Sequence, residues 1–168
     1  MVRRVNFPQI FLAAGNTNAR TESDLGSPVN VMAWANQIRD AGLFAEVLLF
    51  VDGRNMPTDL EPSGQAHQLR LLPSAPPKAS HFYVVARSQG GVSPDTIDAP
   101  SDFAIALLDG LHSKASNTSG QVTGESLRAF LAYRVPFLAE EHPDTPTSVT
   151  CDGDFSMLIA EKTSASPL

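Results

Sequence analysis

The residues best suited to covalent chemistry in this sequence are one cysteine and a few histidines. Cys151 is the single cysteine among 168 residues, and His142 stands nine residues before it. A thiol becomes a nucleophile when a nearby base or cation lowers its pKa. No such group adjoins Cys151 in the sequence, so we interpret it as an ordinary thiol in a loop, Pro146–Gly153, rather than as a relocated nucleophile.

Metal sites are not favoured by the spacing of the candidate ligands. Asp152-Gly153-Asp154 offers two carboxylates, but calcium loops need more oxygen ligands at defined intervals, and we predict a turn that leads into a strand. The histidines lack the spacing of zinc ligands, both with one another and with the lone cysteine. They are His67, His81, His112 and His142. We expect no cofactor and no metal.

Polar side chains that follow two apolar segments are the candidates for binding. Asp52 and Arg54 follow the first segment, where they could pair with each other or bind a charged side chain of a peptide. Arg87 follows the second, and its guanidinium could bind a carboxylate through two nitrogens, although a surface arginine is the simpler interpretation. Ser88 stands beside it, but its neighbours do not form the Gly-x-Ser-x-Gly motif of serine hydrolases.

Composition limits the partners and the setting of the protein. The net charge is −6 without a basic stripe, which argues against nucleic acids and anionic membranes as partners. No stretch approaches the roughly 20 apolar residues of a membrane span. Basic residues precede the apolar run Ile10–Ala14, but Pro8 interrupts and the run is too short for a signal peptide. A lone cysteine cannot form an internal disulfide, so we expect a cytoplasmic protein.

Hydrophobic patterns, together with residues that typically begin or end a helix, predict three helices. Asn30 is a suitable N-cap and Gly42 a suitable stop for the first. Ser101 or Asp102 can cap the second. Thr123 can cap the third, in which Pro136 should cause a kink or an early end. The expected helices cover Val29–Leu43, Phe103–Leu111 and Gly124–Leu138.

Four apolar segments predict strands. The run Ala45–Val51 does not alternate, which is typical of a strand that is buried on both faces in a parallel sheet. The others are Pro8–Ala14, His81–Ala86 and the last strand Phe155–Ile159. Loops are expected at Gly15–Asn18, Met56–Lys78 (with a short helix near Gly64–Leu71), Arg87–Gly91 and Leu111–Gly120, and a flexible tail at 161–168. The order predicts a single α/β domain over 1–160, with three layers and a mainly parallel sheet.

Several blocks resemble the bacterial caspase-like cysteine peptidases, which are relatives of metacaspases. Gly42–Asp52 is similar to the strand before that family's Asp-Cys-Cys-Arg nucleophile loop, and Phe82–Ser88 to the next strand, which contributes to the specificity pocket. Asp102–Leu111 resembles the segment Gly-x-Phe-Thr-x-x-Leu-Leu-x-Gly-Leu. Further blocks follow in the same order, and Gln9–Asp40 resembles the stretch between the Gly-His-Gly motif and the nucleophile. These further blocks are Gly120–Leu127, Tyr133–Pro136, Thr145-Pro146 and Asp152–Phe155.

The resemblance implies a caspase-like αβα sandwich, incomplete at its N-terminus and best matched over 42–160, but the residues for catalysis are missing. The family needs a cysteine after the first matched strand and a histidine before it. Here Asp52-Gly53-Arg54 replaces the nucleophile motif, and no histidine precedes residue 52. Without a thiolate and an imidazole, the family's peptide hydrolysis lacks its two reacting groups.

We therefore expect a catalytically degenerate domain that binds a peptide or protein, with Asp52, Gly53 and Arg54 as a vestigial nucleophile loop. Arg54, Arg87 and Ser88 are the candidate binding residues. The alternative is an active cysteine endopeptidase that takes its histidine from another chain or domain. A third interpretation is a remnant of a longer gene without a function. The apolar last strand predicts a possible homodimer.

Overall fold

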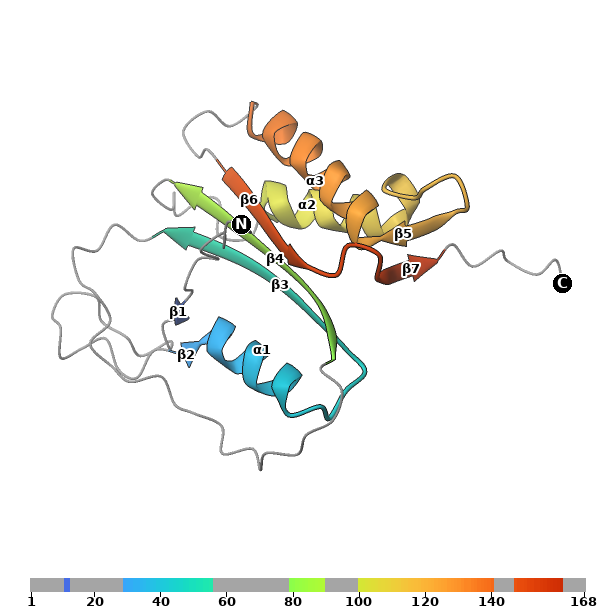
Figure 1. Cartoon of the computed structure of the whole chain (residues 1–168). Coiled ribbons are helices and arrows are strands. Elements are labelled where there is room, and N and C mark those ends of the chain that lie inside the picture. The colour runs from blue at the N-terminus through green and yellow to red at the C-terminus, as the bar shows by residue number, and fades with distance from the viewer. Residues whose placement is uncertain (1–10, 13–28, 56–78, 90–99, 141–146, 162–168) are drawn as a thin grey trace, which may run out of the picture. The chain divides into compact units, whose positions relative to one another are not determined.

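The structure is a computed structural model that describes residues 11–12, 29–55, 79–89, 100–140 and 147–161 (Figure 1). The chain divides into two compact units. One contains Met1–Val47 with Pro57–Ser80, and the other contains Leu48–Met56 with His81–Leu168. The predicted turn at 15–18, the connection at 56–78 with its short helix, and residues 162–168 of the predicted tail lie outside the described residues.

In the first unit, two short strands form an antiparallel pair. They are β1 (Phe11–Leu12) and β2 (Val29–Asn30), with Phe11 opposite Asn30. The strand predicted from Pro8 to Ala14 is therefore described only at its centre.

Helix α1 (Val31–Asp40) follows β2 directly and is shorter at both ends than the predicted helix Val29–Leu43. The side-chain oxygen of Asn30 accepts a hydrogen bond from the N–H of Ala33 at 2.9 Å, so the predicted N-cap is confirmed. The chain leaves the helix through Gly42, whose φ of 62° lies in the left-handed region that glycine tolerates.

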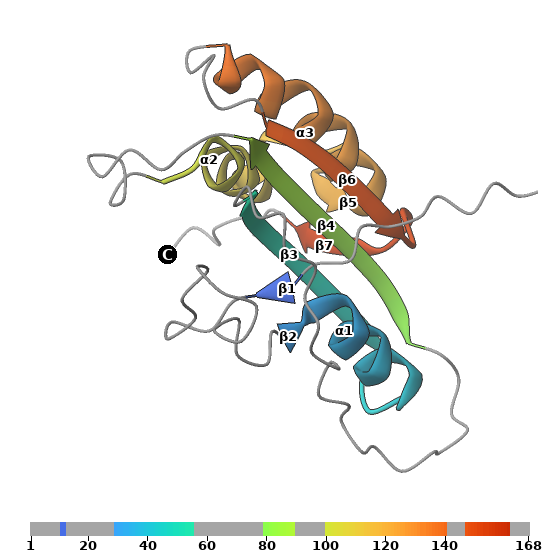
Figure 2. The same cartoon turned by 90° about the vertical axis from the view of Figure 1, so that its left-hand side faces the viewer.

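The second unit is built on a three-stranded sheet with the order β3-β4-β6. Its strands are β3 (Glu46–Asn55), β4 (Ser80–Gln89) and β6 (Thr147–Gly153). β3 and β4 run in the same direction, whereas β4 and β6 are antiparallel with Val84 opposite Cys151 (Figures 1 and 2). The sheet is mixed, so the prediction of a mainly parallel sheet is wrong.

The sequence interpretation missed β6, because it assigned Pro146–Gly153 to a loop. A strand that buries one face needs apolar residues only at alternate positions. In β6 these are Val149 and Cys151, which pack against the core, and polar residues separate them. No apolar run marks such a strand, which is why it read as a loop.

Two further strands form a separate antiparallel pair, β5 (Gln121–Thr123) and β7 (Leu158–Glu161). The predicted last strand was Phe155–Ile159, but its first residues form a turn. The Asp154 carboxylate accepts hydrogen bonds from the N–H and the hydroxyl of Ser156, at 2.9 and 2.6 Å. This local bonding competes with strand geometry and delays β7 until Leu158.

Helices α2 (Asp102–Asp109) and α3 (Gly124–Ala139) lie on one face of the sheet (Figure 2), and a short helical turn, η3 (Gly110–Lys114), follows α2. The predicted caps are confirmed. Ser101 Oγ accepts from the N–H of Ala104 at 2.9 Å, and Thr123 and Ser126 form a reciprocal capping box. Pro136 lies in the last turn of α3, which ends at Ala139.

The core of the second unit lies between this face of the sheet and the two helices. Phe82, Leu127 and Leu131 are fully buried, and each such side chain stabilises the fold by roughly 1.5–3 kcal/mol. The side chain of Leu127 packs directly against the backbone of Gly110, because glycine has no Cβ; a Cβ there would lie only 2.8 Å from a methyl carbon of Leu127. Other members of the core are Val84, Ala86, Phe103, Ala106, Val122, Val135 and Met157.

None of the helices in the described parts of the chain combines the length and apolar character that a membrane crossing requires.

Candidate functional site

The predicted vestigial loop is part of a strand. β3 does not end at Val51 but continues through Asp52, Gly53 and Arg54 to Asn55. A Cβ on Gly53 would lie 3.5 Å from the backbone oxygen of Ala86, an ordinary contact with β4. The prediction of a loop is therefore wrong. A glycine after an apolar run usually indicates the end of a strand, but Gly53 continues the strand beside β4.

Asp52 connects the carboxyl end of β3 to the start of α2. Its carboxylate accepts a hydrogen bond from the hydroxyl of Ser101, and the same hydroxyl oxygen accepts from the N–H of Ala104. Ser101 thus donates to the strand while it caps the helix. The predicted pairing of Asp52 with Arg54 is not tested, because the side chain of Arg54 is outside the described residues.

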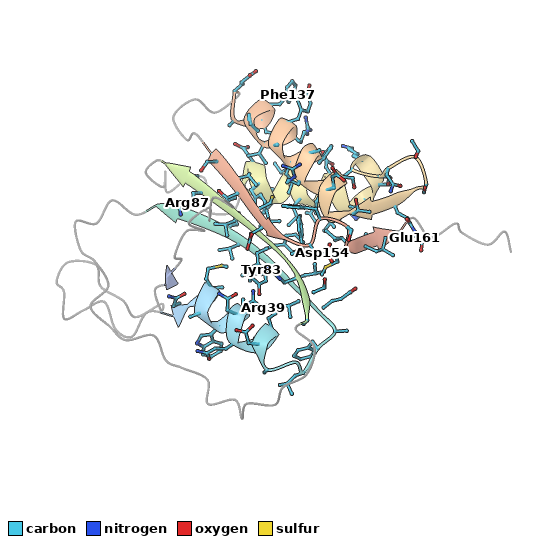
Figure 3. The ribbon with its side chains drawn as sticks, in the orientation of Figure 1. Arg39, Tyr83, Arg87, Phe137, Asp154 and Glu161 are labelled. Carbon is cyan, nitrogen blue, oxygen red and sulfur yellow. The ribbon has the colours of Figure 1, made fainter. Side chains whose placement is uncertain are left out.

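Arg87 and Ser88 lie within β4 and not in the loop that the sequence predicts. Arg87 stands opposite Ser148 of β6, and Ser88 stands opposite Thr147. β4 continues past Ala86 because β6 pairs with it from Phe82 to Ser88. Figure 3 shows Arg87 near the carboxyl end of β4.

These two candidate binding residues lie on opposite faces of the sheet. Side chains alternate along a strand, so Ser88 shares a face with Ala86, which packs in the core. Asp52 contacts Ser101 of the α2 end and belongs to that same face. Arg87 belongs to the other face. The structure therefore brings Ser88 and Asp52 to one face at the carboxyl ends of β3 and β4, without Arg87.

The single thiol lies in the interior face of β6. Cys151 stands opposite Val84 and packs against the core between the sheet and the helices. Burial raises the pKa of the Cys151 thiol to about 11, against the opposing effect of the positive charge of Arg128. Such a thiol is protonated at neutral pH, which is the opposite of what a nucleophile needs.

The described histidines are not placed to activate this thiol. His81 lies in β4, with its Nε2 atom 3.6 Å from a carboxylate oxygen of Asp152 and its ring 4.6 Å from that of Tyr83. By strand alternation, His81 faces away from the layer that contains Cys151. His112 is exposed in η3. His67 and His142 lie outside the described residues.

The predicted turn at Asp152-Gly153-Asp154 is wrong in its position: Asp152 and Gly153 are the last residues of β6, and the turn follows at Phe155 and Ser156. Gly153 has a φ of 118°, and a Cβ there would overlap the backbone oxygen of His81. The N–H of Asp154 donates to that oxygen at 2.7 Å. Within the described ranges, no three side chains of His, Cys, Asp or Glu are grouped so that they could hold a metal ion.

An ion cluster that the sequence interpretation missed joins α2, η3 and α3. The carboxylate of Asp109 lies 2.8 Å from Lys114 Nζ and 3.4 Å from a guanidinium nitrogen of Arg134. The hydrogen bond from Lys114 is the main cause that lowers the pKa of Asp109 below its ordinary value. Asp109 and Lys114 are five residues apart, which is not the spacing of three or four at which side chains pair on an α-helix, and Arg134 comes from another helix, so the cluster gave no local signal.

The contact of Ser101 with Asp52 was missed for a similar reason. The sequence identifies Ser101 as a helix cap, but its other partner lies 49 residues earlier.

A scan against models of protein families, a search of curated proteins and a search of solved structures found no match to this chain.

Proposed function

We propose that this protein is a catalytically inactive caspase-like domain that binds a peptide segment of a partner at the carboxyl ends of β3 and β4. The observation that carries this proposal is the placement of Cys151. Its thiol packs in the core with a raised pKa, and His81 belongs to the opposite face of the sheet. The position where the resemblance requires a nucleophile holds Gly53, within a regular strand.

Peptide hydrolysis by a cysteine needs a thiolate and an imidazole within hydrogen-bond reach of each other. Neither requirement is met among the described residues. The mixed α/β architecture, with helices α2 and α3 on one face of the sheet, is compatible with the caspase-like fold proposed here.

The binding half of the proposal depends on polar groups at the same end of the sheet. The carboxyl ends of neighbouring parallel strands are a common place for ligands in α/β proteins. Here Asp52 and Ser101 lie on the α2 face, and Arg87 lies on the opposite face, half-buried in β4. Arg87 can bind a carboxylate through two nitrogens, so we propose an acidic side chain in the bound peptide.

A binding experiment with labelled peptides tests this function. Fluorescence anisotropy should show binding of peptides with an aspartate or glutamate and weaker binding of their amide counterparts. Arg87→Gln should weaken the acidic peptide roughly tenfold or more, since a hydrogen bond to a charged group contributes about 1.5–3 kcal/mol. The matched control is Arg39→Gln, because Arg39 pairs with its neighbour Asp40 in α1. Equal affinity of acidic and amide peptides would contradict the proposal.

The alternative is a cysteine endopeptidase that uses Cys151 and a histidine of another chain or domain. It would cleave peptides with basic residues, and Cys151→Ala would abolish the cleavage. We expect that neither the unchanged protein nor Cys151→Ala cleaves such peptides. A cleavage that iodoacetamide and Cys151→Ala both remove would establish the alternative.

The proposed setting is the cytoplasm, with a peptide or protein as the partner. The lone cysteine and the acidic net charge support it. Pairing of two copies through the last strand stays a prediction. In the structure, Met157 of that segment is buried in the core, and β7 pairs with β5.

A further inference from the structure

Helix α3 carries apolar residues on two faces, and only one of them packs in the core. Residues three or four positions apart share a face of a helix. The buried face contains Leu127, Leu131 and Val135. The face that points away from the core carries an exposed apolar stripe, which consists of Ala129, Ala132, Tyr133, Pro136 and Phe137. Large apolar groups that gather on a surface indicate an interaction site more often than scattered ones do.

The two aromatic rings of this stripe are suited to contact a cation. Tyr133 is 70% exposed and Phe137 is 44% exposed, and their rings stack with centroids 6.1 Å apart. The faces of aromatic rings attract positive charge. The guanidinium of Arg134 already lies 5.4 Å from the centroid of Phe137, which Figure 3 shows near the C-terminal end of α3. The more exposed ring of Tyr133 leaves area for a cation of a partner.

The backbone of the stripe offers an acceptor as well. Proline has no N–H, so Pro136 cannot donate to the carbonyl of Ala132, four residues earlier in α3. Ala132 is exposed, and its carbonyl oxygen can accept a hydrogen bond from a group outside the helix. A lysine ammonium or an arginine guanidinium is such a donor.

The charged residues of α3 add to this preference for cations. Its two arginines point to the flanks of the helix: the guanidinium of Arg128 lies 5.0 Å from the ring centroid of Phe155, and that of Arg134 pairs with the ion cluster described above. Glu125 and Glu140, by contrast, are exposed at the two ends of the stripe. The apolar stripe therefore lies between two carboxylates.

We propose that this stripe docks a basic amphipathic helix of a partner protein, with its apolar side chains on the stripe and a lysine or arginine near each end. The alanines are small, so a second helix can approach α3 closely between the two glutamates. Glu140 follows Glu125 by fifteen positions, which corresponds to about 22 Å along a helix. The basic residues of the partner should be separated by a similar distance, because complementary charges fix the register of an interface.

A second copy of this chain suits the stripe less well. Antiparallel pairing of two stripes would bring Glu125 of one copy near Glu140 of the other, and parallel pairing would place each glutamate beside its own copy. Like charges would meet in both arrangements, which is unfavourable. The net charge of −6 also favours a basic partner over a second acidic chain.

Fluorescence anisotropy with two labelled model peptides tests this docking surface. The first peptide is an amphipathic helix of leucine and lysine, and the second has glutamate in place of every lysine. We expect the lysine peptide to bind the full chain and the glutamate peptide to bind at least about tenfold more weakly. Equal binding of the two peptides would overturn the proposal.

The first variant tests whether the lysine peptide binds at the stripe. Tyr133→Ser should weaken its binding roughly tenfold, because an exposed aromatic ring at the centre of an interface contributes strongly to affinity. The matched control is Phe44→Ser, which removes another exposed aromatic ring, 57% exposed and just before β3, and should leave the binding unchanged. Circular dichroism confirms that both variants are folded.

The second variant tests the carboxylate at the C-terminal end of the stripe. Lysine is favourable at the end of a helix, so Glu140→Lys should keep α3 folded. The variant should weaken the lysine peptide roughly fivefold at low salt and strengthen the glutamate peptide. Glu46→Lys is the matched control, since it makes the same charge change at an exposed position of β3.

Three further outcomes would overturn the proposal. In the first, Tyr133→Ser and Phe44→Ser change the affinity for the lysine peptide equally. In the second, Glu140→Lys and Glu46→Lys do so, which would mean that the peptide responds only to the net charge. In the third, sedimentation equilibrium shows a dimer that Tyr133→Ser dissociates, which would assign the stripe to a second copy of the chain.

Discussion

The two ends of the three-stranded sheet are built in opposite ways. Where β6 ends and β4 begins, backbone packs on backbone: Gly153 leaves no room for a Cβ beside His81, and Asp154 donates to the same carbonyl. At the other end, Asp52 and Ser101 join strand and helix through side chains, and Asp52 is exposed. The first end holds the fold together through close packing, whereas the second keeps an exposed carboxylate. Substitutions should therefore cost stability at the packed end and much less at the polar end.

The largest effect is expected for Gly153→Ala. The new Cβ would overlap the carbonyl oxygen of His81, and the backbone keeps a φ of 118° that L-residues rarely adopt. Overpacking together with this conformation should lower the free energy of unfolding by roughly 3 kcal/mol or more. Urea denaturation measures it.

The matched control for this change is Gly120→Ala. Gly120 also has a positive φ, 80°, but no atom lies within 4 Å of the added Cβ. It should lose only about 1–2 kcal/mol, the cost of the backbone conformation alone. Equal losses at the two glycines would mean that the close packing at Gly153 is not what stabilises this end.

A large kinetic effect is expected for Cys151, which lies in β6 close to the packed end. With the thiol pKa raised from about 9 to about 11, the thiolate population at pH 8 is about a hundredfold smaller than in the unfolded chain. Labelling by iodoacetamide should be slower in the folded protein by at least this factor. Rapid labelling of the folded protein at pH 8 would show that the thiol is not buried in solution.

The same thiol makes stability depend on alkaline pH. Its pKa is higher in the folded state, so its contribution is complete below the unfolded value near 9 and is lost as the pH rises toward 11. In Cys151→Ser, the free energy of unfolding should depend less on pH over this interval than it does in the unchanged protein. Its curve between about pH 6 and pH 8 should run parallel to that of the unchanged protein, because neither side chain titrates there.

A smaller effect is expected for Ser101→Ala at the polar end. The variant loses the cap of α2 and the hydrogen bond to Asp52, which should cost about 1 kcal/mol in thermal or urea unfolding. Ser101→Thr keeps the hydroxyl and should recover most of the loss. A cost as large as that of Gly153→Ala would erase the distinction between the two ends.

The smallest effect is expected for Asp109→Asn, away from both ends. The pKa of Asp109 is lower in the folded state, so the carboxylate stabilises the fold above its unfolded pKa of about 3.9 and loses this effect as the pH falls through the folded value. The difference in melting temperature between the two proteins should be small at about pH 7 and vanish once the pH has fallen below the folded pKa of Asp109. Asp40→Asn is the control, because Asp40 pairs only with its neighbour Arg39 in the described contacts.

The sequence predicted those parts of the fold that depend on local signals. Asn30, Ser101 and Thr123 were identified as helix caps because a cap acts on N–H groups within three residues. The apolar runs of β3 and β4 were identified because each run is itself a local signal, although both strands extend further than predicted.

The parts that were missed depend on partners that are distant in the sequence. β6 is a strand because β4 pairs with it, and its own residues alternate without an apolar run. Arg87 and Ser88 read as a loop, but the pairing with β6 extends β4 past them. For the candidate site, Asp52 was identified, whereas its contact with Ser101 has no signature in either local sequence.

The start of α3 has a consequence for how this chain is made. Its first N–H groups donate to carbonyls of Met157 and Phe155, and β4 and β5 find partners in β6 and β7. A growing chain on the ribosome therefore carries two strands and a helix end that stay incomplete until residues 147–161 have left the exit tunnel. The apolar surface of β4 is exposed during that interval, so binding by a chaperone at the tunnel exit would protect it from aggregation.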